Sequence, residues 1–267
     1  MTSPGEPAGT AGRRRRGSSF GAAAAAYARH RPGYAQAAVR WALEPVRCRR
    51  PLRAVDLGAG TGKLTATLLR LGTDVTAVEP DGNMLAELRR RLPSVRALRG
   101  SAEDIPLPDG SADAVLAGQA MHWFDLDRAL PEIARVLVPG GVLAGLWNLD
   151  DDRTGWVAEL AAVTGDGRVT LSDWRDRHGR FRAQRLAATG AALFRGVAAR
   201  EFRHGQRRTA DSLVATIATR SAVLVMDEAE RAALLARARD FLRGRPETSR
   251  GEFMLPMITA TLRAVRA

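Results

Sequence analysis

The chain has 267 residues, 45% of them hydrophobic, which is enough to form one large α/β domain with its own core. Its only cysteine, Cys48, excludes an internal disulfide, and four scattered histidines argue against a zinc cluster. No run of 18 apolar residues is present. We therefore expect no membrane span, no signal peptide and no metal, and a cytoplasmic location.

The formal net charge is +12, and it is unevenly distributed. Residues 1–50 carry +8, residues 51–150 carry −3 and residues 151–267 carry +7. Lys63 is the only lysine among 41 basic residues. Arginine excess of this kind is typical of a GC-rich genome. It is therefore weak support for a nucleic-acid partner.

The N-terminal segment divides into a tail and two helices. Residues 1–18 are rich in Gly, Pro, Ser and Arg without periodicity, which predicts a disordered basic tail. Residues 20–31 are rich in alanine and end before Pro32, which predicts a helix. A second helix is predicted near residues 35–43.

Strands and helices alternate between residues 50 and 150. Strands are predicted near residues 53–57, 74–79, 95–99, 113–118 and 142–147, and helices near 62–71, 82–92 and 127–138. This alternation predicts a parallel sheet with helices on both faces. Ligands of such sheets bind beyond the carboxyl ends of the strands. Asp56, Glu79, Ser101 and Gln119 fall at or just after those ends, as His122 and Asn148 would.

The first strand runs into a glycine-rich turn. Residues 56–62 read Asp-Leu-Gly-Ala-Gly-Thr-Gly, followed by a helical pattern. The spacing is G-x-G-x-G, and Lys63 stands where the dinucleotide fingerprint would place its last glycine. A strand, a tight turn and a helix N-terminus suit the polar part of a nucleoside cofactor. Glu79, at the tip of the second strand, is well placed to accept hydrogen bonds from ribose hydroxyls.

Five blocks in order resemble the motifs of the class I S-adenosylmethionine-dependent methyltransferases. They lie in residues 54–64, 78–84, 100–111, 112–124 and 132–141. The subgroup that they most resemble is the type 11 set of small-molecule enzymes related to those of ubiquinone biosynthesis. The resemblance implies an α/β, Rossmann-like sheet of seven strands, mostly parallel with an antiparallel last strand. It also implies helices on both faces and S-adenosylmethionine as cofactor.

The resemblance also implies cofactor-binding residues. They would be Arg31, Asp56, Gly58, Ala59, Gly60, Thr61, Gly62, Glu79, Pro80, Met84, Ser101, Ala102, Glu103 and Gln119. Asp56 to Gly62 would surround the methionine part, Glu79 the ribose, and the residues from Pro80 to Glu103 the adenine. Arg31 is either a partner of the cofactor carboxylate or a surface arginine. Met84 is equally consistent with helix core, and Glu103 with a helix cap.

Candidate acceptor-binding residues are Tyr27, Tyr34, Trp123 and Trp147. His122 follows the fourth strand, where the acceptor is expected. It has the right unperturbed pKa for a general base, and a structural histidine is the alternative. Trp147 is either pocket wall or core.

Four regions are expected: the tail over 1–18, lid helices with the cofactor core over 19–150, a helical cap insertion over 151–195, and strands and helices over 196–267 that complete the domain.

The predicted function is methyl transfer to O, N or C of a small organic molecule, by a monomer or homodimer. An RNA methyltransferase and a non-catalytic cofactor-binding protein are the alternatives. The Asn/Asp-Pro-Pro-Tyr/Phe motif of many base-methylating enzymes is absent.

Overall fold

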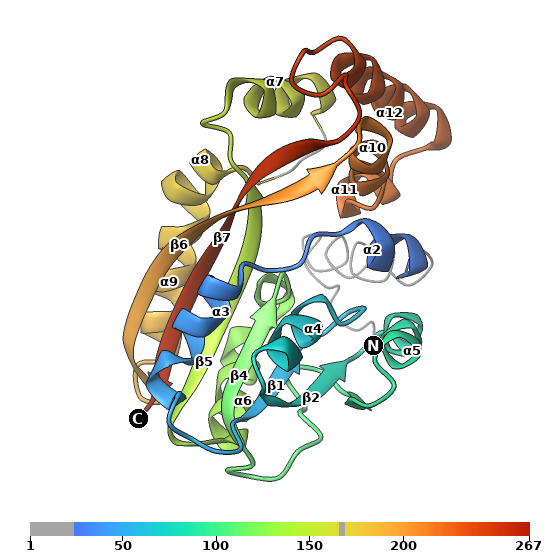
Figure 1. The fold of residues 1–267 in the computed structure, drawn as a ribbon. Helices are drawn as coiled ribbons and strands as arrows, with labels where there is room; N and C mark the ends of the chain where they lie inside the picture. Colours follow the sequence, from blue (N-terminus) through green and yellow to red (C-terminus); the bar gives the residue numbers. More distant parts are fainter. Residues whose placement is uncertain (1–23, 166–168) are drawn as a thin grey trace, which may run out of the picture.

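A computed structural model describes residues 24–165 and 169–267 (Figure 1). The predicted tail over residues 1–18 lies outside these ranges. The strands are β1 (Arg53–Leu57), β2 (Asp74–Glu79), β3 (Arg96–Arg99), β4 (Ala112–Gly118), β5 (Leu137–Asp150), β6 (Phe194–Arg208) and β7 (Phe253–Arg266).

The α-helices are α2 (Ala24–His30), α3 (Gln36–Leu43), α4 (Lys63–Arg70), α5 (Gly82–Arg91), α6 (Leu126–Val136), α7 (Gly155–Thr164), α8 (Leu171–Asp173), α9 (Gly179–Thr189), α10 (Ala210–Ala218), α11 (Ser221–Leu224) and α12 (Glu228–Arg243). Shorter turns are η2 (Glu44–Val46), η3 (Met121–Trp123) and the π-helical η4 (Trp174–His178). Within the described ranges, no helix has both the length and the apolar character needed to cross a bilayer.

One seven-stranded sheet runs in the order β3-β2-β1-β4-β5-β7-β6. β1 pairs in parallel with β2 and β4, whereas β7 runs antiparallel to both β5 and β6. The predicted Rossmann-like sheet with an antiparallel last strand is therefore confirmed. The strand order reverses between β1 and β4, and sheets of this kind bind ligands at such a reversal.

Helices cover both faces of the sheet because the side chains of β5 alternate between them. Leu143 and Trp147 belong to a buried cluster with α6 and α9, which includes Leu130 and Leu186. Ala144 and Leu146 of the same strand join the cluster of α3 and α4 on the other face. The two faces of β5 therefore belong to two separate cores.

A third buried cluster lies around the far ends of β6 and β7 (Figure 1). We call its helices, α7 with α10, α11 and α12, the cap. Leu160 of α7 packs there with residues of α10 and α12. Residues 151–195, expected to form a single cap, are instead divided, because Leu171 and Leu186 of α8 and α9 pack on the sheet. β6 and β7 are long strands, and α10 to α12, which lie between them in the chain, pack against α7.

The cap cluster provides a stability test on one helix. Leu160 is fully buried, whereas Val163 of the same helix is 38% exposed. We expect Leu160→Ala to lower the free energy of unfolding by about 2–5 kcal/mol, because a buried cavity is created. Val163→Ala should change it by less than about 1 kcal/mol. Urea denaturation measures both, and equal effects of the two changes would contradict the packing of α7 in the cap.

Candidate active site

The glycine loop between β1 and α4 is held against the end of β2. The backbone N–H groups of Gly58 and Ala59 both donate to the carbonyl of Val78, at 2.9 and 3.1 Å. Gly60 and Gly62 have positive φ angles of 56° and 84°, which glycine adopts without a steric penalty. An added Cβ at Gly60 would have no neighbour within 4 Å. The loop therefore presents open space at Gly60, as close approach of a ligand requires.

The carboxylate of Glu79 connects this loop to the next turn. One oxygen accepts from the Gly60 N–H at 2.8 Å, and the other from the Asp81 N–H at 2.9 Å. Glu79 is only 6% exposed. Burial raises the pKa of its carboxyl, while the two N–H donors act in the opposite direction. The structure thus brings together the two features that the sequence analysis placed at the cofactor.

Asp56 is fully buried at the end of β1. One oxygen accepts from the Thr65 hydroxyl at 2.5 Å, whereas the other has no hydrogen-bond partner among the described residues. Burial raises the pKa of this carboxyl to about 7, against the effect of Thr65. The buried hydroxyl of Thr61 also lacks a partner there. Such orphaned polar atoms beside an open loop fit a polar ligand.

Several of the residues expected around adenine pack in the core or make hydrogen bonds within the protein. Met84 and Ala102 are both 4% exposed, and Ala102 packs in the α6 core cluster. The Ser101 hydroxyl accepts from the Glu103 N–H at 3.3 Å. Glu103 in turn accepts from the N–H of Asp125, which caps α6. Pro80 remains exposed at the end of β2.

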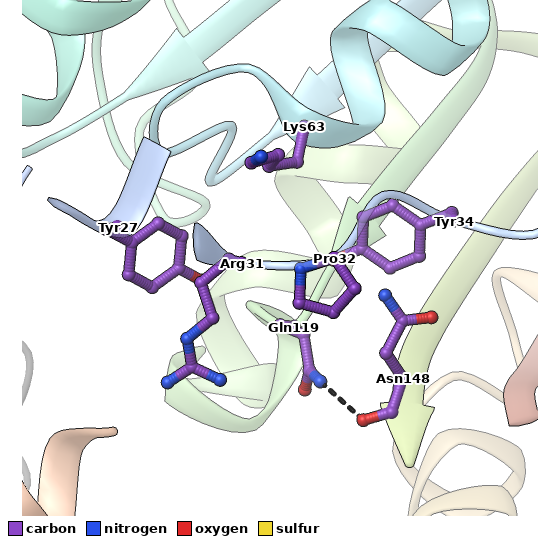
Figure 2. A pocket seen from close by; sticks show the side chains of 7 residues that line it. All are labelled: Tyr27, Arg31, Pro32, Tyr34, Lys63, Gln119 and Asn148. Atoms are coloured by element: carbon purple, nitrogen blue, oxygen red, sulfur yellow. Dashed lines mark hydrogen bonds between the residues drawn. The ribbon is translucent and has the colours of Figure 1, made fainter. Parts of the chain in front are cut away.

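A pocket opens where the N-terminal segment crosses the strand ends (Figure 2). Seven residues line it: Tyr27, Arg31, Pro32, Tyr34, Lys63, Gln119 and Asn148. Four of them, Tyr27, Arg31, Tyr34 and Gln119, were expected at the site.

Gln119 is the only non-glycine residue with a positive φ angle among the described residues. Its side-chain amide donates to the Asn148 carbonyl at 2.9 Å. Backbone strain held in this way is typical of functional sites.

Residues 24–35, which we call the lid, are fastened both to the cap side and to the strand ends. The carbonyl of His30 accepts from Thr216 of α10 at 3.0 Å, and also from Arg208. The Gly33 carbonyl accepts from the Asn148 side chain at 2.9 Å. The Ala35 N–H donates to the Thr259 hydroxyl of β7 at 3.2 Å. The lid therefore joins the cap to the strand ends.

Two candidate acceptor residues lie elsewhere. Trp147 points to the opposite face of β5 from Asn148, as strand alternation requires. Its indole ring lies 4.7 Å from that of Trp174, and the Arg182 guanidinium lies 5.4 Å from the Trp147 ring. Trp147 is thus a core residue and not a lining residue of this pocket. Trp123 lies in η3, outside the seven lining residues.

His122 also lies in η3, with its ring 4.7 Å from that of Trp123. It is half-buried and is not among the seven lining residues. Its role as a general base stays a prediction.

Three lining residues, Pro32, Lys63 and Asn148, were not chosen from the sequence. The sequence could have indicated Lys63 as a site residue, because it is the only lysine and directly follows the glycine loop. The sequence could also have indicated Asn148, because it directly follows the predicted fifth strand. Pro32 reaches the pocket only because the lid crosses the strand ends, and no local sequence pattern indicates this.

The two glycines of the loop allow a matched test. A methyl group at Gly62 would lie 2.9 Å from a Leu92 carbon, whereas one at Gly60 meets open space. Positive φ costs either alanine about 1–2 kcal/mol. We expect Gly62→Ala to unfold at the lower urea concentration, and Gly60→Ala to lose at least about tenfold in affinity for S-adenosylhomocysteine. Unimpaired binding by Gly60→Ala would contradict the placement of the ligand at this loop.

Asp56 makes stability depend on pH. Its carboxyl stays protonated up to about pH 7 in the folded protein but loses its proton near pH 4 when unfolded. Between these values the folded state binds more protons, so stability falls as the pH rises. Without ligand, the wild type should lose about 1.4 kcal/mol per pH unit relative to Asp56→Asn between pH 5 and 6.5. Urea denaturation measures this difference, and Asp74→Asn, at an exposed position, is the control. A difference independent of pH would show that Asp56 stays ionised.

The chain is similar to known methyltransferases. Residues 55–145 match a family model described as a methyltransferase domain. An uncharacterized methyltransferase of Mycobacterium tuberculosis is 42% identical over 260 residues, which cover 97% of this chain and all of the relative. An uncharacterized methyltransferase of Schizosaccharomyces pombe is 38% identical over 148 residues, covering 55% of this chain and 59% of that protein.

A solved structure supports the same assignment. A putative type II methyltransferase from Anaeromyxobacter dehalogenans is 28% identical, with a TM-score of 0.60, over 88% of this chain and 97% of the other. The chain belongs to the class I S-adenosylmethionine-dependent methyltransferases.

Proposed function

We propose that this methyltransferase binds S-adenosylmethionine at the glycine loop and transfers its methyl group to O, N or C of a small organic molecule. One observation carries the cofactor assignment. Glu79, buried at the tip of β2, accepts the Gly60 N–H while the loop beside it stays open. A nucleoside with two ribose hydroxyls suits a carboxylate in that position.

Each carboxylate oxygen of Glu79 accepts one backbone N–H in the structure. An ionised carboxylate has about four acceptor sites, so two remain for the ribose hydroxyls. Asp56 would face the cofactor ammonium with its unpartnered oxygen. Pro80, Met84, Ser101, Ala102 and Glu103 would surround the adenine, as the family resemblance implies.

When bound, the cofactor supplies an activated methyl group on its sulfonium. The remaining task of the protein is to align the acceptor and exclude water. We assign the enclosure to the lid, because Tyr27 and Tyr34 cover the strand ends beside Gln119. Acceptors that arrive protonated need a base, and His122 is our candidate for it.

Small-molecule chemistry is favoured over RNA by where the charge lies. The pocket is lined by residues of the lid, the start of α4 and the strand ends, and two of them are tyrosines. Residues 51–150, which hold the glycine loop and Glu79, carry a net charge of −3, and the positive excess is carried by residues 1–50 and 151–267. Gel-shift titration with a tRNA at physiological salt should therefore show no appreciable binding. Sub-micromolar binding that depends on RNA structure would favour the alternative.

Isothermal titration tests the cofactor assignment. The protein should bind S-adenosylhomocysteine with a micromolar Kd, on the order of −8 kcal/mol, and should not bind NAD. Glu79→Gln should weaken S-adenosylhomocysteine binding by about 2–4 kcal/mol, because charge-assisted bonds to the ribose are lost. Glu87→Gln, an acid on α5 paired with Arg90, is the control and should bind normally. NAD binding without any response to S-adenosylhomocysteine would overturn the assignment.

A further inference from the structure

The lid is joined to the strand ends through one buried hydroxyl, that of Thr259 on β7. Thr259 is 0% exposed. The Ala35 N–H of the lid donates to its Oγ1 at 3.2 Å, the Asn148 Oδ1 lies 2.7 Å from it, and the His204 Nε2 lies 3.1 Å from it. A hydroxyl has one proton and two lone pairs. These three partners therefore use the full hydrogen-bonding capacity of the Thr259 hydroxyl.

Strand register explains why these side chains meet. Thr259 is the register partner of Asn148 on β5 and of Phe202 on β6. Paired residues point to the same face of a sheet, and so does His204, two residues after Phe202. This is the face that the lid crosses, since the Asn148 side chain also donates to the Gly33 carbonyl at 2.9 Å. A chain of hydrogen bonds thus runs from β6 across β7 and β5 to the lid.

The direction of each bond in this chain can be assigned. The Gly33 carbonyl only accepts, so the Asn148 nitrogen must face it, and Figure 2 shows that nitrogen on the side of the lid. The Asn148 oxygen then accepts the Thr259 proton. The two lone pairs of Thr259 remain for donors, and one of them accepts the Ala35 N–H. His204 must therefore donate from Nε2. Burial lowers the pKa of His204, so its ring is neutral at pH 7 and Nδ1 carries no proton.

We propose that Thr259 and His204 are positioning residues that hold the lid closed over the pocket, an inference that rests on the proposed function. We call the Thr259 hydroxyl with its three partners the latch. Neither Thr259 nor His204 is among the lining residues, and both act through Asn148, which lines the pocket, and through Ala35. The hydroxyl binds Asn148 and the lid together, and the His204 N–H fixes the direction in which its proton points.

The latch has a kinetic consequence. Without the Thr259 hydroxyl, three polar groups lose their partner, and opening of the lid to water becomes less costly. The latch joins groups of the protein only, so its opening costs the same with a ligand bound or absent. A ligand changes an equilibrium only by its different affinity for the two states. Loss of the latch should therefore speed both entry and exit of a ligand and leave its affinity nearly unchanged.

Thr261 provides a matched control for Thr259. It lies two residues further along β7 on the same face, and it is 1% exposed. Its hydroxyl has no hydrogen-bond partner among the described residues. Thr259→Val and Thr261→Val each keep the branched shape of the side chain and remove a buried hydroxyl. A difference between the two variants is therefore due to the hydrogen bonds of Thr259.

Stopped-flow mixing with S-adenosylhomocysteine tests the latch. In Thr259→Val, association and dissociation should both be about 5- to 100-fold faster, with the Kd changed by less than about threefold. Thr261→Val should match the wild type, and Thr259→Ser, which restores the hydroxyl, should recover slow exchange of the ligand. Amide hydrogen exchange should also be faster in Thr259→Val at Ala35 and its lid neighbours, and unchanged in β1 and β4.

His204 provides a second readout. Nitrogen-15 spectra at pH 7 should show its proton on Nε2, and a proton on Nδ1 would contradict its assigned role. His204→Leu should speed ligand exchange by about 2- to 10-fold, because Thr259 loses one donor. His204→Gln keeps an N–H at a similar reach and should exchange ligand more slowly than His204→Leu. Since His204 is only half-buried on an edge strand, these variants test the latch even where Thr259→Val does not fold.

The outcomes distinguish the two proposals. If Thr259→Val and His204→Leu exchange S-adenosylhomocysteine at the rates of Thr261→Val, or lose affinity at an unchanged association rate, the latch is wrong while the cofactor assignment stands. If the wild type does not bind S-adenosylhomocysteine, the proposed function itself fails.

Discussion

The carboxylate of Glu79 is the interaction on which the cofactor half of the molecule depends. By accepting N–H groups from Gly60 and Asp81, it holds the loop after β1 and the start of α5 to the end of β2. Burying a carboxylate is costly unless donors satisfy it. Two backbone donors meet part of that cost and leave acceptor sites open. The same side chain therefore shapes the loop and remains available to a ligand.

The lid connects this cofactor half to the rest of the chain. It contacts the cap through Thr216 and Thr219 and the strand ends through Asn148 and Thr259. A local excess of positive charge arises here although residues 51–150 are acidic overall. Net charge over a segment is thus a poor guide to the charge of the pocket.

The other face of β5 shows how an arginine-rich chain packs its core. The guanidinium of Arg182 lies over the rings of both Trp147 and Trp174, at 5.4 and 5.8 Å. Burial lowers the pKa of Arg182, and the aromatic faces offset part of the cost of desolvation. Trp147 is therefore committed to packing. Its neighbour Asn148 points to the lid side and takes the polar role at the pocket.

Local patterns in the sequence predicted the parallel strands, the glycine loop and the placement of Glu79, because strand periodicity and a G-x-G-x-G turn are local properties. The antiparallel last strand was expected from the family resemblance. It also identified Arg31, Tyr27, Tyr34 and Gln119. Only the tertiary structure decided that Lys63 and Asn148 join them, that Trp147 does not, and that residues 151–195 divide between cap and sheet. These outcomes depend on the lengths of β6 and β7 and on lid contacts between residues far apart in the chain, which no local pattern specifies.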